Sequence, residues 1–110
     1  MSTAMHPKAS ALLVKLSGHL GADQGITGKA LAAWFNWPTR DVRKYVSQLR
    51  EQGTAVCGHP STGYFIANTP DELEASCRFL RARAMHSLSL EARLRRVSLP
   101  TLLGQINLNT

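Results

Sequence analysis

The sequence predicts a mainly α-helical protein with one small β-hairpin, an α+β fold. Apolar residues recur at helical spacing in four segments of the 110-residue chain. Between the third and fourth of these segments lie two short runs at 54–57 and 64–67, expected to be strands. The segment GHPSTG joins the two runs, and its Gly and Pro residues are typical of a hairpin turn.

The first two helices are expected on either side of a glycine-rich segment. The first runs from about Lys8 to His19 and ends at the glycines of GHLGADQG. Ile26 is expected in a short strand before the next helix. Thr27 is a good N-cap residue, because its side-chain oxygen can accept a hydrogen bond from the first turn. The second helix is therefore expected to follow it through about Phe35.

A tight turn is expected to separate the second helix from the third. Asn36 tolerates the left-handed conformation that such a turn requires. Pro38 disfavours a helical conformation in the residue before it. Thr39 is then expected to cap a third helix that runs to Gln52, where Gly53 supplies the stop.

At about 100° per residue, the helix that begins near Thr39 has an apolar arc and a cationic arc. The apolar arc is expected to be buried against Leu31 and Phe35 and holds Val42, Tyr45, Val46 and Leu49. The opposite arc holds Arg40, Lys44, Ser47 and Glu51, with Arg43 and Arg50 to one side. The outward surface thus begins with cations and a small hydroxyl, and its one acid comes at the far end.

The segment ALAAWFNWPTRDVRKYVSQLREQG resembles a helix-turn-helix, in which the second helix enters the DNA major groove. The run LREQGTAVCGHPSTGYFIA is similar to the second half of the biotin-repressor type of winged helix. There a helix that ends in Gly leads to a strand, a short turn and a Gly-Tyr strand. The resemblance covers about Ile26 to Ala67. It implies a winged helix-turn-helix with an added C-terminal helix, and DNA binding of the kind found in small bacterial or phage regulators.

Carried over position by position, the resemblance implies DNA contacts from the recognition helix and from the wing tip. These positions are Thr39, Arg40, Arg43, Lys44 and Ser47 in the helix, and His59, Ser61 and Thr62 in the wing. Arg and Lys suit guanine edges and phosphates, and hydroxyls can contact phosphate. The sequence departs from the family pattern in two places. Asn36 and Trp37 replace the usual Gly-apolar turn. The wing has no Lys or Arg, which predicts that it binds the phosphates of the DNA backbone only weakly.

The segment NTPDELE carries the clearest helix start in the chain. Thr69 is an N-cap, Pro70 suits the first helical position, and Glu72 completes a capping box. This helix is expected to reach about Val97, with a break or bend near residues 87–89. The apolar tail that follows is expected to be irregular.

We therefore expect a winged helix-turn-helix domain over 8–69 and a C-terminal helix with its tail over 70–110. The second region is expected to make the protein a homodimer, since Leu73, Cys77, Leu80 and Ala84 follow the spacing of a coiled-coil seam. Two alternatives remain open: the helix folds back onto the first helix within the monomer, or it binds another protein. The arginines of this segment would repel one another unless DNA phosphates or an acidic partner neutralise them.

The net charge of +6 favours a polyanionic partner. No apolar run approaches the roughly 20 residues that a membrane helix needs. Cys57 and Cys77 are too few for a disulfide framework or a structural zinc site, so the cytoplasm is the expected compartment. The four histidines show no spacing typical of a metal site, and no nucleophile elbow frames a serine.

The sequence thus predicts a protein that binds double-stranded DNA in a sequence-specific manner, as a small transcriptional regulator. It is expected to be no enzyme and to use no metal or cofactor. One alternative is a winged-helix protein–protein adaptor in replication or phage machinery. Another is an RNA-binding or nonspecific nucleic-acid protein led by the arginine-rich C-terminal helix.

Overall fold

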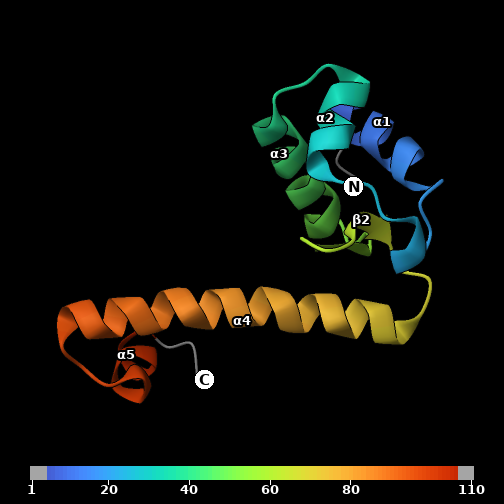
Figure 1. Ribbon diagram of the computed structural model, residues 1–110. Helices are drawn as coiled ribbons and strands as arrows, with labels where there is room; N and C mark the ends of the chain where they lie inside the picture. The colour runs from blue at the N-terminus through green and yellow to red at the C-terminus, as the bar shows by residue number, and fades with distance from the viewer. Residues whose placement is uncertain (1–4, 107–110) are drawn as a thin grey trace. The chain divides into compact units, whose positions relative to one another are not determined.

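The computed structural model describes residues 5–106 and confirms a mostly helical α+β protein with a two-stranded antiparallel sheet (Figure 1). Its elements are α1 (Pro7–Leu16), the 3-10 helix η1 (Ala22–Gln24), α2 (Gly28–Phe35), α3 (Thr39–Glu51), β1 (Val56–His59), β2 (Gly63–Ile66), α4 (Pro70–Arg95) and α5 (Leu99–Gln105). The chain divides into two compact units, residues 1–76 and 77–110, and α4 runs from one into the other.

The core of the first unit lies among α1, α2 and α3. The apolar arc expected on α3 is buried there, with Val42 and Leu49 fully inaccessible to solvent. Leu31 of α2 is buried in the same cluster, and Phe35 packs against it while half-buried. The other members of the core are Ala9, Leu12 and Leu16 of α1, Ala32 of α2, Tyr45 and Val46 of α3, and Val56 of β1. The expected rotation of α3 about its axis is therefore confirmed.

The turn between α2 and α3 is closed by a left-handed residue, as the sequence indicated. Asn36 has φ 57°, and the N–H of Trp37 donates to the carbonyl of Ala32 at 2.9 Å. This is the Schellman arrangement, which satisfies carbonyls at a helix end. The indole of Trp37 stacks on Phe35, with ring centroids 4.1 Å apart, and so covers the turn.

The expected cap of α3 is wrong by one residue. Thr39 is the first residue of the helix, and the N-cap is Pro38. The proline ring fixes φ near −60°, and with ψ 147° Pro38 already has the extended conformation of an N-cap. The helix therefore begins one position earlier than a threonine cap would allow.

The hairpin is offset from the expected strands of 54–57 and 64–67. β1 starts two residues later and β2 one residue earlier, and Val56 pairs with Ile66 while His59 pairs with Gly63. The turn sets this register, because the N–H of Thr62 donates to the carbonyl of His59 at 3.1 Å.

The second edge of β2 is paired with the segment that joins α1 to α2. Ile26 and Tyr64 exchange two backbone hydrogen bonds, of 2.8 and 2.7 Å. Farther along, Ile66 accepts from Gly21 and donates to His19, both at 2.9 Å. The short strand expected at Ile26 is thus an isolated bridge rather than a full strand.

Two glycines allow this segment to approach the hairpin. A Cβ at Gly25 would lie 1.9 Å from the carbonyl oxygen of Thr62. A Cβ at Gly63, whose φ is +77°, would lie 2.5 Å from the backbone of Ile26. Backbone atoms cannot move aside as a flexible side chain can, so both positions require glycine.

The start of α4 is joined to the same segment through one carboxylate. The hydroxyl of Thr69 accepts from the N–H of Glu72 at 3.2 Å, which confirms the first half of the capping box. The Glu72 carboxylate accepts from Asn68 at 2.8 Å and from the distant Ala22 at 2.7 Å. These backbone hydrogen bonds, that of Ala22 foremost, lower the pKa of Glu72 because they stabilise its ionised form.

In the second unit, α4 continues without interruption to Arg95, so the break expected near residues 87–89 is wrong. Serine costs only about 0.5 kcal/mol more than alanine in a helix interior, which is too little to break a helix without Gly or Pro. The helix ends at Arg95: Arg96 after it has φ 56°, and the N–H of Val97 donates to the carbonyl of Ala92 at 3.0 Å.

The tail expected to be irregular forms α5, and its last residues lie outside the described ones. The Ser98 hydroxyl accepts from the N–H of Thr101 at 3.2 Å, so this serine is an N-cap. Figure 1 shows α5 near the C-terminal end of α4, and both Leu102 of α5 and Ala92 of α4 are buried. The Ser98 cap and this burial explain why the tail is helical.

Replacing Gly63 by Ala is expected to cost about 3–5 kcal/mol of unfolding free energy, because left-handed strain and a backbone collision add together. Gly53→Ala is the matched control. Gly53 has φ +86°, but a Cβ added there would have no atom within 4 Å, so the variant should cost about 1–2 kcal/mol. Urea unfolding measures both. Equal midpoints for the two variants would contradict the close approach at the hairpin.

The Glu72→Gln variant is expected to change how stability depends on acid. Folding lowers the pKa of Glu72. Its ionised carboxylate therefore stabilises the folded state at pH values above the ordinary pKa of about 4.5, and this stabilisation is lost as the pH falls further. The wild-type protein should therefore exceed the variant in stability at pH 7, and the difference should shrink below pH 4.5. Urea unfolding between pH 3 and pH 7 tests this, and a constant difference would count against it.

Candidate nucleic-acid interface

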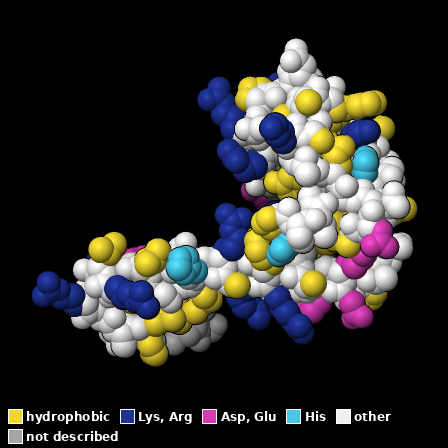
Figure 2. Space-filling model, in the orientation of Figure 1, with side chains coloured by type: hydrophobic (Ala, Val, Ile, Leu, Met, Phe, Trp, Pro, Cys, Tyr) yellow, Lys and Arg dark blue, Asp and Glu magenta, His cyan; other side chains and the backbone are white. Residues whose placement is uncertain are grey.

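The residues expected to read DNA lie together on the outward side of α3. Thr39, Arg40, Arg43, Lys44 and Ser47 are all exposed. They occupy the N-terminal two and a half turns of the helix, whose opposite side is buried in the core. Dark-blue Lys and Arg side chains are visible over this part of the surface in Figure 2. The arrangement presents cations and hydroxyls together on the exposed side of one helix.

Acidic groups of α3 do not interrupt this surface. Asp41, in the first turn, accepts from Lys8 of α1 at 3.4 Å and is only partly exposed. Glu51 is exposed at the far end of the helix. The N-terminal half of α3 is therefore the part of the helix where a polyanion meets the least repulsion.

Arg50 has a structural role that the sequence did not indicate. Its Nε donates to the carbonyl of Val56 at 2.8 Å, which joins the C-terminal end of α3 to β1. Lys44 lies close to the helix surface, with its Nζ 5.5 Å from the ring centre of Tyr45. No local sequence pattern predicts the hydrogen bond from Arg50 to Val56, because it depends on how the chain folds back from the helix to the strand.

The residues expected at the tip of the hairpin form their own hydrogen bonds. The Nδ1 of His59 lies 2.7 Å from the Ser61 hydroxyl and accepts from the Ser61 N–H at 3.1 Å. The Thr62 hydroxyl donates to the carbonyl of Gly63 at 3.0 Å. His59 and Ser61 are exposed, and Thr62 is half-buried. The turn thus has a defined conformation, and no lysine or arginine lies in it.

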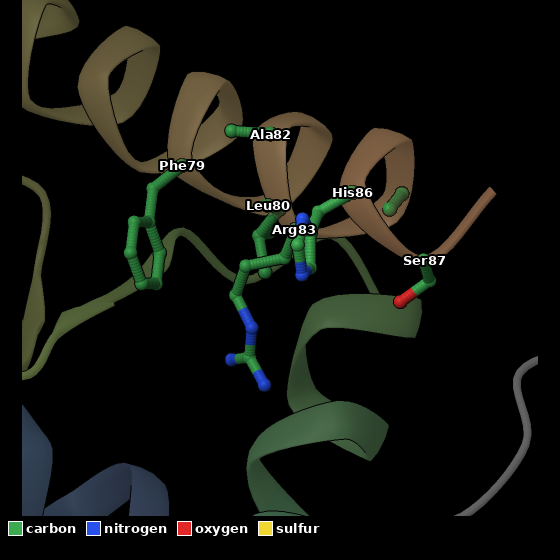
Figure 3. A pocket seen from close by; sticks show the side chains of 7 residues that line it. Phe79, Leu80, Ala82, Arg83, His86 and Ser87 are labelled. Atoms are coloured by element: carbon green, nitrogen blue, oxygen red, sulfur yellow. The ribbon is translucent and has the colours of Figure 1, made fainter. Parts of the chain in front are cut away.

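Other kinds of site find little support in the part of the chain that the structure describes. No group of three His, Cys, Asp or Glu in 5–106 is arranged to hold a metal ion. Figure 3 shows an open hollow along α4, lined by Phe79, Leu80, Ala82, Arg83, Ala84, His86 and Ser87. All of these residues belong to one helix, so the hollow is a helix surface. Among the described residues, no helix is long and apolar enough to cross a membrane.

Comparison with known proteins adds no assignment to this geometry. No protein-family model, curated protein or solved structure matches the chain. A function must therefore be inferred from the residues of this chain alone, and foremost from the exposed cations of α3.

Proposed function

We propose that this protein binds double-stranded DNA in a sequence-specific manner, as a winged helix-turn-helix regulator with α3 in the major groove. The observation that carries the proposal is the exposed group of Arg40, Arg43 and Lys44 on the first turns of α3. In helix-turn-helix proteins, base contacts come mainly from this end of the second helix.

The order of the elements supports a winged helix. α1 is followed by a short bridge at Ile26, then by α2, α3 and the hairpin, and the bridge pairs with β2. This is the order that the sequence resemblance implies. Within it, α3 is the recognition helix and residues 59–62 form the tip of the wing.

The side chains suggest how the contacts divide between bases and phosphates. Arg40 and Arg43 can donate two parallel hydrogen bonds to a guanine edge or to a phosphate. Lys44 supplies a point charge for phosphate, and Thr39 and Ser47 supply hydroxyl donors. The wing adds only hydroxyls, an imidazole and backbone N–H groups, so its contribution to affinity is small.

The proposed protein is a homodimer through α4, because a single small DNA-binding domain covers few base pairs. Leu73 and Leu80 remain 43% and 41% exposed, and Cys77 and Ala84 lie exposed between and beyond them. These four residues form one apolar stripe, which is the usual contact surface of a helix pair. Two DNA-binding domains joined in this way bind adjacent half-sites more tightly, because binding of the first raises the effective concentration of the second.

A protein–protein adaptor is the second candidate function, and one observation favours it. Trp34 of α2 is 66% exposed, and the Nζ of Lys15 lies 3.8 Å from its ring centre. Exposed tryptophan is enriched where proteins bind one another. An adaptor would show no duplex binding at low salt, which separates the two functions.

The Arg40→Ala, Lys44→Ala double variant tests the recognition surface. Both side chains are exposed, so the variant should melt like the parent, within about 0.5 kcal/mol of unfolding free energy per site. Preference for a site selected from a random duplex library should fall by roughly ten- to a hundredfold, since each lost base contact costs about 1–3 kcal/mol of discrimination. Gel-shift titration measures this preference. Unchanged preference would refute the placement of the site.

Two alanines on α4 provide a matched test of the dimer. Ala84 belongs to the apolar stripe, whereas Ala82 is also exposed but lies about 160° away around the helix. Ala84→Asp should therefore convert the dimer to a monomer, and Ala82→Asp should leave it dimeric. Sedimentation equilibrium decides the matter. A parent protein that is monomeric at high concentration would contradict the proposed dimer. So would the same oligomeric state for both variants.

A further inference from the structure

Positive charge is divided unequally between the two units. Residues 1–76 contain seven Lys and Arg and six Asp and Glu, a net charge of +1. Residues 77–110 contain six Arg and one Glu, a net charge of +5. The unit that holds α3 is thus nearly neutral as a whole, and most of the attraction for a polyanion arises in the second unit.

The cations of the second unit are all arginines, and they are all exposed. Arginine is more weakly hydrated than lysine and can donate two parallel hydrogen bonds to a phosphate. Arg95 is paired with Glu91 at 2.7 Å, and Glu91 is the one acid of this unit. Neither Arg83 nor Arg93 has a carboxylate partner among residues 5–106.

Arg83 and Arg93 lie on one side of α4. At about 100° per residue, Phe79, Arg83, His86, Leu90 and Arg93 fall within an arc of roughly 80°. We call these five residues the arginine face. Figure 3 shows Phe79 and Arg83 extending from the same side of the helix. The guanidinium carbon of Arg83 lies 5.8 Å from the ring centre of Phe79, a cation–π contact that helps to orient it.

The arginine face is separate from the other surfaces of α4 in this unit. Its centre lies roughly 130° around the helix from the apolar stripe of Leu73, Cys77, Leu80 and Ala84. Ala92, which is buried, lies on a third side. A dimer formed through the stripe would therefore leave the arginine face exposed.

We propose that Arg83, His86 and Arg93 bind the sugar-phosphate backbone of duplex DNA as a second, sequence-independent contact. Arg83 and Arg93 are ten residues apart, about 15 Å along the helix axis. At 3.4 Å per base step of one strand, this separation spans about four steps. The inference rests on the proposed DNA binding by α3. It assigns most of the affinity to the second unit and the choice of sequence to the first.

The salt dependence of binding to a random-sequence 30-base-pair duplex tests the arginine face in the full-length protein. The Arg83→Gln, Arg93→Gln variant should lower the slope of log K against log salt by about 2, since each lost phosphate contact contributes about 0.9. The Arg83→Lys, Arg93→Lys variant keeps the charge and should keep the slope. The control is Arg78→Gln, Arg81→Gln, which removes the same charge from another side of α4 and should lower the slope by less than about 1.

Each outcome decides the matter. An unchanged slope for Arg83→Gln, Arg93→Gln overturns the inference, and so does an equal fall for the control pair, which would indicate diffuse attraction. Binding of the parent to phosphatidylserine vesicles with none to DNA also overturns it, in favour of a membrane surface. The Arg40→Ala, Lys44→Ala variant separates the two proposals. It should lose preference for a selected site, whereas the slope measured on random duplex should fall by no more than about 1, the share of the Lys44 phosphate contact. A parent that binds no duplex at 50 mM salt, a concentration at which phosphate contacts are strong, defeats the proposed function together with the inference.

Discussion

β2 is hydrogen-bonded along both of its edges, and the arrangement of the first unit depends on this strand. β1 pairs with one edge, and the segment from His19 to Ile26 pairs with the other. Because that segment joins α1 to α2, its pairing fixes the hairpin against the three-helix core. A two-stranded hairpin by itself is at best marginally stable in water. Gly25 and Gly63 make the pairing possible, since a side chain at either position would meet backbone atoms.

The same constraint positions the elements that surround the proposed DNA-binding surface. Arg50 joins the C-terminal end of α3 to the start of β1. Glu72 joins the first turn of α4 to Ala22, in the segment paired with β2. A substitution at Gly25 or Glu72 therefore acts on the surface of α3 through the fold, without changing a side chain of the proposed DNA-binding surface.

In the proposed function, phosphate attraction and sequence recognition belong to different parts of the chain. The side chains suited to base edges lie on α3, in a unit with a net charge of +1. The larger positive charge lies in the second unit, on α4 and the residue after it. Phosphate attraction is long-ranged and independent of sequence, whereas base contacts need a rigid helix at a fixed angle. A rigid core beneath α3 and an exposed cationic helix in the other unit match these two requirements.

The sequence by itself determined the features that depend on local physics. The turn at Asn36, the buried arc of α3 and the helix start at Thr69 follow from backbone preferences and helical periodicity within a few residues. The same periodicity placed the cations of α3 on the solvent side, so the candidate site could be drawn before the fold was known.

Tertiary structure alone decided the features that depend on distant partners. The strand limits follow from pairing between β1 and β2, and the bridge at Ile26 follows from an edge that no local pattern reveals. The burial of Leu102, which adds to the local cap of Ser98 in stabilising the helix in the tail, could not be read from the sequence. Glu72 caps its own helix and also accepts a hydrogen bond from the N–H of Ala22, fifty residues away in the chain, at 2.7 Å, and only the folded chain brings these two groups together. Local preferences amount to fractions of a kcal/mol per residue, and non-local hydrogen bonds and burial outweigh them wherever the two compete.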